Sequence, residues 1–302
     1  MKRLPQIALL PDGKRLHLQD GPIDLIIEAK GSDAEVRAAH DAAARRFTGL
    51  LDELCVELVP LRQAVDPASC ALKGVVARRM HAAVAPFASG HFITPMAAVA
   101  GSVAEEILGT MLHVARLDRA YVNNGGDIAL HLADGERFTV GLMDRPDRHG
   151  VMRTMTVDAD DAARGIATSG RHGRSFSLGI ADAVTVLART ASQADAAATI
   201  IANAVDLPGH PAVVRRPANE LQPDSDLGTR LVTREVSSLG DDEIEAALRT
   251  GAVQAQQLFA AGLIEGAALR LRGETVVVGT ADVATRALPS LGERAIEGVT
   301  HV

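Results

Sequence analysis

Aromatic side chains are scarce in this sequence of 302 residues, which has no Trp, one Tyr and six Phe. Proteins that bind single-stranded nucleic acid stack the bases on aromatic rings, and duplex binders usually carry a strongly basic surface. This chain has a formal net charge of -7 and an isoelectric point near 5.8. We therefore expect no nucleic-acid partner.

Cysteine is also rare, because Cys55 and Cys70 are the only two. Two cysteines cannot build a disulfide framework or a cysteine-rich zinc site. Lysine is present only at positions 2, 14, 30 and 73, so no lysine amine lies in the middle of the chain, where the motifs below occur.

Long apolar runs are missing as well. The longest weakly polar run, residues 92–104, is too short to span a bilayer. The basic N-terminal segment is interrupted by Pro5, Pro11 and Asp12, which is not typical of a secretory signal. We expect a cytoplasmic protein with no membrane partner.

Hydrophobic periodicity predicts an α+β protein in which antiparallel sheets pack against helices. Turn residues separate short β-rich runs, whereas longer amphipathic runs predict helices. The predicted strands are 6–10, 15–19, 23–29, 120–124, 127–133, 137–143, 152–158, 182–188 and 230–236, with a hairpin at 268–279. The predicted helices are 33–62, 69–84, 96–116, 192–205, 241–249 and 252–261, and residues 215–230 read as a loop.

These elements suggest one domain over residues 1–302. Its long helices would occupy about 33–116, a β-rich core about 117–190, and the C-terminal helices and hairpin about 230–285. A chain of this length can bury a large core.

Two polar residues interrupt the alanine-rich stretch "RTASQADAAATIIANAV". Asp195 and Thr199 are four residues apart, so a helix places both on one face. Ser192 and Asp195 also fit a capping box at a helix start. The pair therefore either stabilises the start of the helix or supplies two oxygen ligands to a hard cation. The two roles do not exclude each other.

Two glycine-rich segments lie upstream, "NNGGDI" at 123–128 and "GIATSGRHG" at 165–173. Each is most simply a turn. Glycine also lets backbone N–H groups approach a phosphate closely, so each segment is a candidate phosphate-binding loop.

In this order, "NNGGDI", "GIATSG", "DAVTVLA" and "ADAAAT" resemble the motifs of the ApbE group, flavin transferases that move FMN from FAD onto a protein threonine using Mg²⁺. The resemblance implies an ApbE-like fold and FAD or FMN as cofactor. It implies that Mg²⁺ is bound by the side chains of Asp195 and Thr199 and by the carbonyl of Ala167. The cofactor-binding residues that it implies are Asn124, Gly125, Gly126, Asp127, Thr168, Ser169, Gly170, Gly101 and Glu105.

Three departures from the transferase pattern weigh against FMN transfer. Ala100 stands where the transferases have a lysine, and Glu105 stands where they have an Asp that helps to hold the cofactor. The loop "HGRSFSLG" has Ser175 and Phe176 in place of the Asp and Pro of the transferase loop. The segments "ELQPDSDLGTRLVT" and "AAGLIEGAALRLRG" resemble the uncharacterised ApbE-like branch.

His172 is the candidate catalytic residue, because it lies between Arg171 and Arg174 in a glycine-framed loop. It is either a general acid or base, an anion-binding group, or an ordinary surface histidine. We expect a phosphate-bearing small-molecule ligand, with a protein partner and a homodimer as further possibilities. The first function that the resemblance implies is an ApbE-like enzyme, related to the FMN transferases, that acts on or uses a flavin or similar phosphate-bearing ligand with Mg²⁺. The alternative function is a non-catalytic flavin- or nucleotide-binding or accessory protein, in a setting such as sulfur-amino-acid assimilation.

Overall fold

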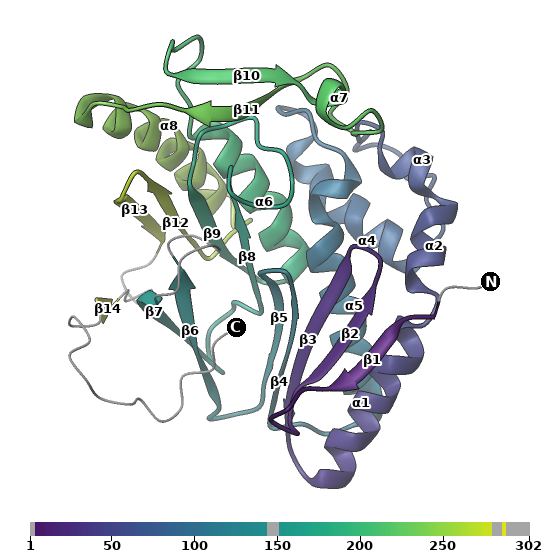
Figure 1. Ribbon diagram of the computed structural model, residues 1–302. Helices are drawn as coiled ribbons and strands as arrows, with labels where there is room; N and C mark the ends of the chain where they lie inside the picture. Colours follow the sequence, from purple (N-terminus) through teal and green to yellow (C-terminus); the bar gives the residue numbers. More distant parts are fainter. Residues whose placement is uncertain (1–3, 144–150, 280–285, 288–302) are drawn as a thin grey trace. The chain divides into compact units, whose positions relative to one another are not determined.

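The computed structural model describes residues 4–143, 151–279 and 286–287. Its contacts divide the chain into two units that alternate along the sequence. Figure 1 labels the helices and strands of both. Unit 1 comprises Met1–Arg137, Asp158–Ala167 and Ala188–Ala196. Unit 2 comprises Phe138–Val157, Thr168–Leu187 and Ala197–Val302.

Unit 1 contains an antiparallel run of strands in chain order. The strands are β1 (Gln6–Leu9), β2 (Leu16–Asp20), β3 (Ile23–Lys30), β4 (Arg119–Asn124) and β5 (Asp127–Leu132). The first part of β8 (Gly165–Ser169) pairs with β5. Apolar residues alternate along β2 and β3, and the buried ones face the core of the unit.

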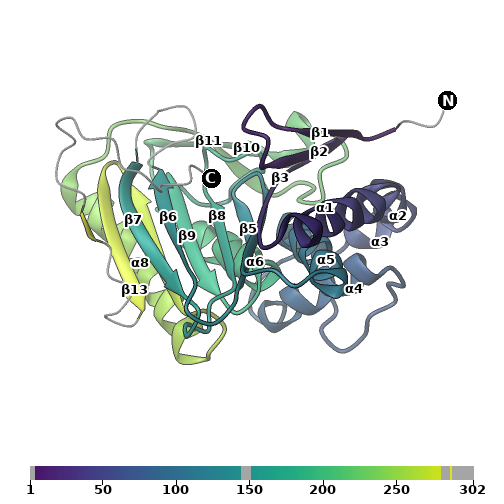
Figure 2. The ribbon, with the colours of Figure 1, turned by 90° about the horizontal axis from the view of Figure 1, so that it is seen from below.

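Helices cover one face of these strands, as Figures 1 and 2 show for the helices at Asp33–Phe47 and Val99–Val114. The helices of unit 1 are α1 (Asp33–Phe47), α2 (Leu50–Val56), α3 (Leu58–Leu61), α4 (Val75–Val84) and α5 (Val99–Val114), with short 3₁₀ helices at Ala85–Phe87 and Pro95–Ala98. The core lies between α1, α4, α5 and the sheet, and its bulkiest members include Phe47, Met80 and Met111. Burial of this apolar surface is the main favourable term in folding.

The single helix predicted over 33–62 is wrong, because the chain forms α1, α2 and α3 there. Gly49 has φ 88°, a left-handed conformation that ends a helix, and it separates α1 from α2. The helix predicted over 69–84 begins only at Val75, after Gly74.

Unit 2 combines strands of two separate sheets, a two-stranded ribbon and a long helix. The strands are the last part of β8, most of β6 (Arg137–Met143), β7 (Val151–Asp158) and β9 (Ala183–Ala188), and all of β10 (Val213–Pro217), β11 (Leu231–Val236), β12 (Gly266–Leu271), β13 (Glu274–Gly279) and β14 (Arg286–Ala287). The helices are α7 (Ala218–Leu221) and α8 (Asp241–Ala260), which packs against the antiparallel pair β12–β13. Helix α6 (Ala191–Ala204) begins in unit 1 and ends in unit 2.

Three sequence predictions are corrected in this part of the chain. The "GIATS" segment was expected as a loop and forms β8. The loop expected over 215–230 contains the end of β10 and α7. The two helices expected around Gly251 form one helix, α8, in which that glycine is buried.

The helices and antiparallel strands confirm the predicted α+β class. The single domain over residues 1–302 stays a prediction. No helix in the described ranges has both the length and the apolar character that a membrane crossing needs.

Candidate functional site

Helix α6 begins at Ala191, one residue earlier than predicted. The Oγ1 atom of Thr190 accepts a hydrogen bond from the N–H of Gln193 at 3.3 Å, as an N-cap side chain does. The predicted capping box of Ser192 and Asp195 is therefore wrong, since the cap lies two residues before Ser192. Asp195 is left without a role at the start of its own helix.

Asp195 instead binds the N-terminal turn of α5 in unit 1. Its Oδ2 atom accepts a hydrogen bond from the Gly101 N–H at 3.0 Å. Burial raises the pKa of the Asp195 carboxyl to about 7, the N–H groups of Gly101 and Ala100 oppose that rise, and the charge of Glu105 adds to it. The N-cap of α5, Ala98, makes no side-chain hydrogen bond, so this carboxylate serves as the cap from outside the helix.

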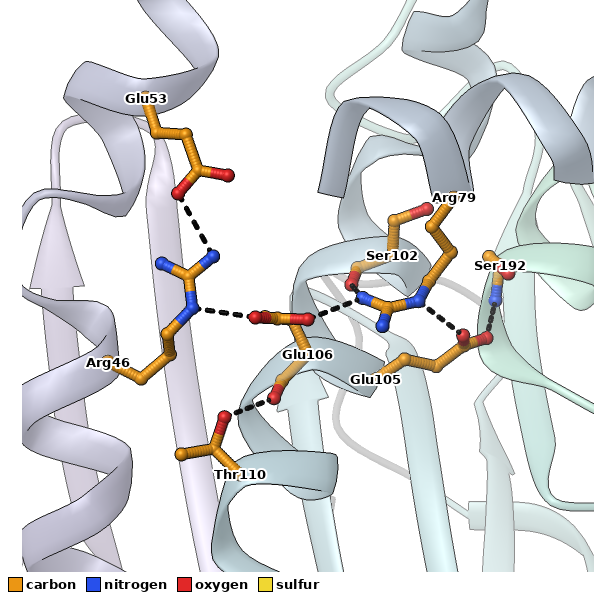
Figure 3. Close-up of polar contacts among 8 residues, drawn as sticks. All are labelled: Arg46, Glu53, Arg79, Ser102, Glu105, Glu106, Thr110 and Ser192. Atoms are coloured by element: carbon orange, nitrogen blue, oxygen red, sulfur yellow. Dashed lines mark hydrogen bonds and ion pairs between the residues drawn. The ribbon is translucent and has the colours of Figure 1, made fainter. Parts of the chain in front are cut away.

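Glu105 makes the converse contact. It lies on α5, and its Oε1 atom accepts a hydrogen bond from the Ser192 N–H in the first turn of α6 at 2.6 Å. Its Oε2 atom lies 3.2 Å from Nε of Arg79 on α4 (Figure 3). Each of the two helices thus satisfies an N-terminal N–H of the other with a carboxylate, because such N–H groups have no acceptor within their own helix.

Two glycines allow the start of α6 to lie this close to α5 and to β8. A Cβ atom on Gly101 would lie 2.3 Å from the carbonyl oxygen of Ala191, and one on Gly165 would lie 2.2 Å from the nitrogen of Ala191. Both contacts are with backbone atoms, which cannot rotate away. Gly101, predicted to bind the cofactor, is therefore needed for the contact between α5 and α6.

A chain of ion pairs continues from Glu105 across unit 1 (Figure 3). Nη1 of Arg79 lies 3.0 Å from Oε2 of Glu106, whose Oε1 lies 2.6 Å from Nε of Arg46. Arg46 on α1 also contacts Glu53 on α2 at 3.0 Å. Burial alone would raise the pKa of the Glu106 carboxyl, but Arg46 and Arg79 lower it below its usual range.

The "NNGGDI" segment forms the β4–β5 hairpin turn in unit 1. Gly125 and Gly126 have φ 67° and 109°, as a two-residue turn of type I′ requires. The Gly126 N–H donates to Oδ1 of Asn123 at 2.8 Å. Asn124 is buried and donates from Nδ2 to the carbonyl of Ala100 on α5 at 3.1 Å. These contacts give the segment a structural role. Asp127, which is the first residue of β5, is partly buried.

The "TSG" segment lies in unit 2. Thr168 is exposed, and its Oγ1 atom lies 2.9 Å from Oγ1 of Thr185 on β9; Ser169 is partly buried. Gly170 has φ 148°, and a Cβ there would lie 2.6 Å from the carbonyl oxygen of Asp182. That close approach explains why residue 170 is a glycine, and the explanation needs no ligand.

Asp182 is the centre of a polar cluster in unit 2. Its Oδ1 atom accepts from Nη2 of Arg171 at 2.6 Å and lies 3.2 Å from Nε2 of His172, while Oδ2 accepts from the Arg272 N–H at 2.6 Å. Burial would raise the pKa of the Asp182 carboxyl, but the Arg272 N–H, Arg171 and His172 lower it. His172, the candidate catalytic residue, is thus paired with a carboxylate.

The predicted site residues are divided between the units. Thr199 and Asp195 share α6, one turn apart, and both are partly buried, whereas Ala167 is fully buried in β8. The sequence reasoning missed Arg79 and Asp182. Arg79 is in helical register with buried Val76 and Ala83, a polar residue on an apolar face that periodicity could have singled out.

A family model described as "AbpE bacteria" matches residues 7–277. The chain belongs to this ApbE-like family. The family assignment made from the ordered motifs is thereby confirmed.

Relatives of this ApbE-like protein include UPF0280 proteins. One from Methanopyrus kandleri is 34% identical over 178 residues, covering 58% of this chain and 66% of that protein. Another, from Methanococcoides burtonii, is 39% identical over 130 residues, covering 40% of this chain and 49% of that protein. The chain thus spans about half to two thirds of the length of these relatives.

The apo crystal structure of the flavinyl transferase ApbE from Pseudomonas stutzeri has a similar fold. It is 11% identical, with a TM-score of 0.50, and the match covers 93% of this chain and 96% of that one. This likeness confirms the predicted ApbE-like fold.

Proposed function

We propose that this ApbE-like protein binds a flavin nucleotide, or a similar phosphate-bearing ligand, together with Mg²⁺. The observation that carries the proposal is the Asp195 carboxylate, which is held at the N-terminal turn of α5 and keeps part of its surface exposed. A carboxylate fixed by backbone donors is a suitable ligand for a hard cation.

The donors named for Mg²⁺ fit the preference of this ion. Asp195 offers a carboxylate, Thr199 a hydroxyl and Ala167 a backbone carbonyl, all hard oxygen ligands. Among the described residues no group of three or more His, Cys, Asp or Glu side chains could hold a metal. Mg²⁺ commonly takes only one or two protein carboxylates and completes its shell with phosphate oxygens and water, so this sparse set is adequate.

A cation held by these donors would supply positive charge next to the phosphates of the ligand. The chain's own part is to hold the oxygen donors and to offer hydroxyls, of which Thr168 and Ser169 are the candidates in unit 2. The other candidate cofactor-binding residues come from the family resemblance, and they are Asn124, Gly125, Gly126, Asp127, Gly170, Gly101 and Glu105. Several of them already make the structural contacts described above.

We propose binding without transfer of FMN as the activity. Ala100 replaces the transferase lysine, and Ser175 and Phe176 replace the Asp and Pro of the transferase loop. His172 and Arg171 both contact Asp182, so the position of His172 has a structural explanation that needs no acid–base role. A cytoplasmic location, a protein partner and a homodimer stay predictions.

Ligand-dependent stability tests the metal. With FAD at a hundredfold excess over its dissociation constant and Mg²⁺ present, the wild type should gain about 2.7 kcal/mol of stability by mass action. Asp195→Asn keeps an acceptor for the Gly101 N–H but removes the charge, and we expect it to lose the Mg²⁺-dependent part of this gain. The exposed Asp134→Asn is the matched control. An equal gain in Asp195→Asn, measured by thermal unfolding with and without Mg²⁺, would refute a metal at this residue.

Mass spectrometry tests the absence of transfer. The protein is incubated with FAD, Mg²⁺ and a threonine-bearing acceptor peptide, and we expect no covalent FMN on the peptide. Flavinylated peptide would show that the altered loop still supports transfer, and the same assay with His172→Ala would then locate the group that assists it.

A further inference from the structure

We infer that Arg79 and Glu105 form a positioning pair that holds the first turn of α6, and with it Asp195, against the N-terminal turn of α5. The inference rests on the proposed function only in taking Asp195 as the metal ligand. Glu105 stands where the transferases use an acid to hold the cofactor, so this is a different use of that position.

Both oxygens of Glu105 are already engaged within unit 1. Oε1 accepts from the Ser192 N–H at 2.6 Å, and Oε2 is paired with Nε of Arg79 at 3.2 Å (Figure 3). A carboxylate held on both sides by charge-assisted contacts has a defined orientation. Glu105 therefore fixes the position of the Ser192 backbone.

Arg79 is itself held from three sides, as Figure 3 shows. Its Nη1 atom donates to the carbonyl of Ser102 at 3.1 Å and to Oε2 of Glu106 at 3.0 Å, in addition to the Glu105 contact. The planar guanidinium spans two neighbouring carboxylates, which a lysine ammonium cannot reproduce. The pair is thus anchored on both α4 and α5.

The α6 start has little room to adopt another position. Gly101 and Gly165 both approach the backbone of residues 190–192 so closely that a methyl group would overlap it. Asp195 lies one turn after Ser192 on the same helix, so a displacement of Ser192 moves the carboxylate. Residues that orient a metal ligand are typically worth about 10–100-fold in metal affinity.

The test compares two double variants that leave the net charge unchanged. Arg79→Met with Glu105→Met removes the positioning pair and leaves Glu106 paired with Arg46. Arg46→Met with Glu53→Met removes the other end of the same ion-pair chain and leaves Glu106 paired with Arg79. Only the first double variant should disturb Asp195.

The first readout does not depend on any ligand. The Gly101 N–H has the Asp195 carboxylate as its acceptor, so its amide hydrogen exchange reports whether that contact is kept. We expect exchange about tenfold faster in the Arg79/Glu105 variant, as for a lost bond to a charged group, and little change in the Arg46/Glu53 variant. Unchanged Gly101 exchange in the Arg79/Glu105 variant would overturn the inference.

The second readout is calorimetric titration of Mg²⁺ in the presence of FAD. We expect affinity about tenfold weaker in the Arg79/Glu105 variant and close to wild type in the control. Affinity that falls equally in both would overturn the inference. If Asp195→Asn binds Mg²⁺ like the wild type, the metal proposal fails, yet Gly101 exchange still tests the pair. Should the double variant not fold, Arg79→Lys is used, with a smaller increase in exchange expected because lysine spans only one carboxylate.

Discussion

At the scale of single residues, several residues whose motifs resemble ligand-binding groups also hold the protein together. Asn124 donates to the carbonyl of Ala100, Glu105 accepts from Ser192, and Gly170 approaches the backbone of Asp182. A polar motif can therefore have a structural explanation that is complete without a ligand, and only a ligand-dependent measurement separates the two roles.

Asp182 is the residue whose loss we expect to be most costly in unit 2. Asp182→Asn removes a largely buried charge that three donors stabilise, and should lower the free energy of unfolding by about 2–4 kcal/mol near pH 7. Urea unfolding measures this change. The exposed Asp160→Asn, as control, should change stability little.

The same carboxylate predicts a pH dependence. Its pKa is lower in the folded protein than the ordinary 3.8, so its contribution to stability is fully present above that value. The contribution is lost as the pH falls through the lower folded value, because protonation then breaks the contacts with Arg171. Stability should therefore fall more steeply below pH 3.8 in the wild type than in Asp182→Asn. Parallel curves would contradict this.

Two glycines with positive φ should differ in cost when a methyl group is added. Gly126 has open space around its Cβ position, so Gly126→Ala should cost only the backbone strain, about 1–2 kcal/mol. Gly170→Ala adds an overlap with the Asp182 carbonyl, and we expect about 2–4 kcal/mol in total. Chemical unfolding of both variants tests the order, and a larger cost at Gly126 would contradict it.

At the scale of elements, the periodic patterns were a good guide to helices and strands but a poor guide to their ends. The hairpin β12–β13, and the strands β4 and β5 on either side of Gly125 and Gly126, were predicted because turn residues separate the β-rich runs. The prediction of one long helix over 33–62 was wrong at Gly49, because an apolar pattern does not reveal that this residue has a left-handed backbone. The break predicted at Gly251 does not occur. This glycine lies inside a continuous helix, where close packing leaves little room for a side chain.

Two helix glycines give a matched test of that reason. Gly109 in α5 is exposed and nothing lies near its Cβ position, so Gly109→Ala should stabilise the protein by about 0.5–1 kcal/mol through helix propensity. Gly251→Ala in α8 would place a methyl group 2.3 Å from Cγ2 of Val205, and should destabilise by about 1–3 kcal/mol. Thermal unfolding that shows stabilisation by both substitutions would contradict this.

The candidate site was predictable only in part, for a physical reason. Asp195 and Thr199 could be placed on one helix from their spacing, and the structure has both on α6. The partners of Asp195 could not be found in this way, because the Gly101 N–H is 94 residues distant in sequence and belongs to the backbone. Arg79 and Glu105 are likewise paired across two helices, and no local pattern encodes that contact.

Over its full length, the chain passes repeatedly between the two units. Residues 1–137 hold most of unit 1, but β8 beside β5 and the start of α6 come from later segments. We expect a fragment of residues 1–137 to show no cooperative thermal transition by circular dichroism, since it lacks both the β5 pairing and the Asp195 cap. A fragment of residues 1–196 contains every segment of unit 1 and is the control. Cooperative melting of the shorter fragment at the wild-type temperature would refute the requirement.

The exchange of carboxylates between α5 and α6 also bears on synthesis by the ribosome. Helix α5 is made before the acceptor of its Gly101 N–H, since Asp195 follows Gly101 by 94 residues. At about 5–20 residues per second, this interval lasts roughly 5–20 s. During this time the nascent α5 and its partly apolar neighbours are available to chaperones, and the last step of folding in unit 1 must await the emergence of α6.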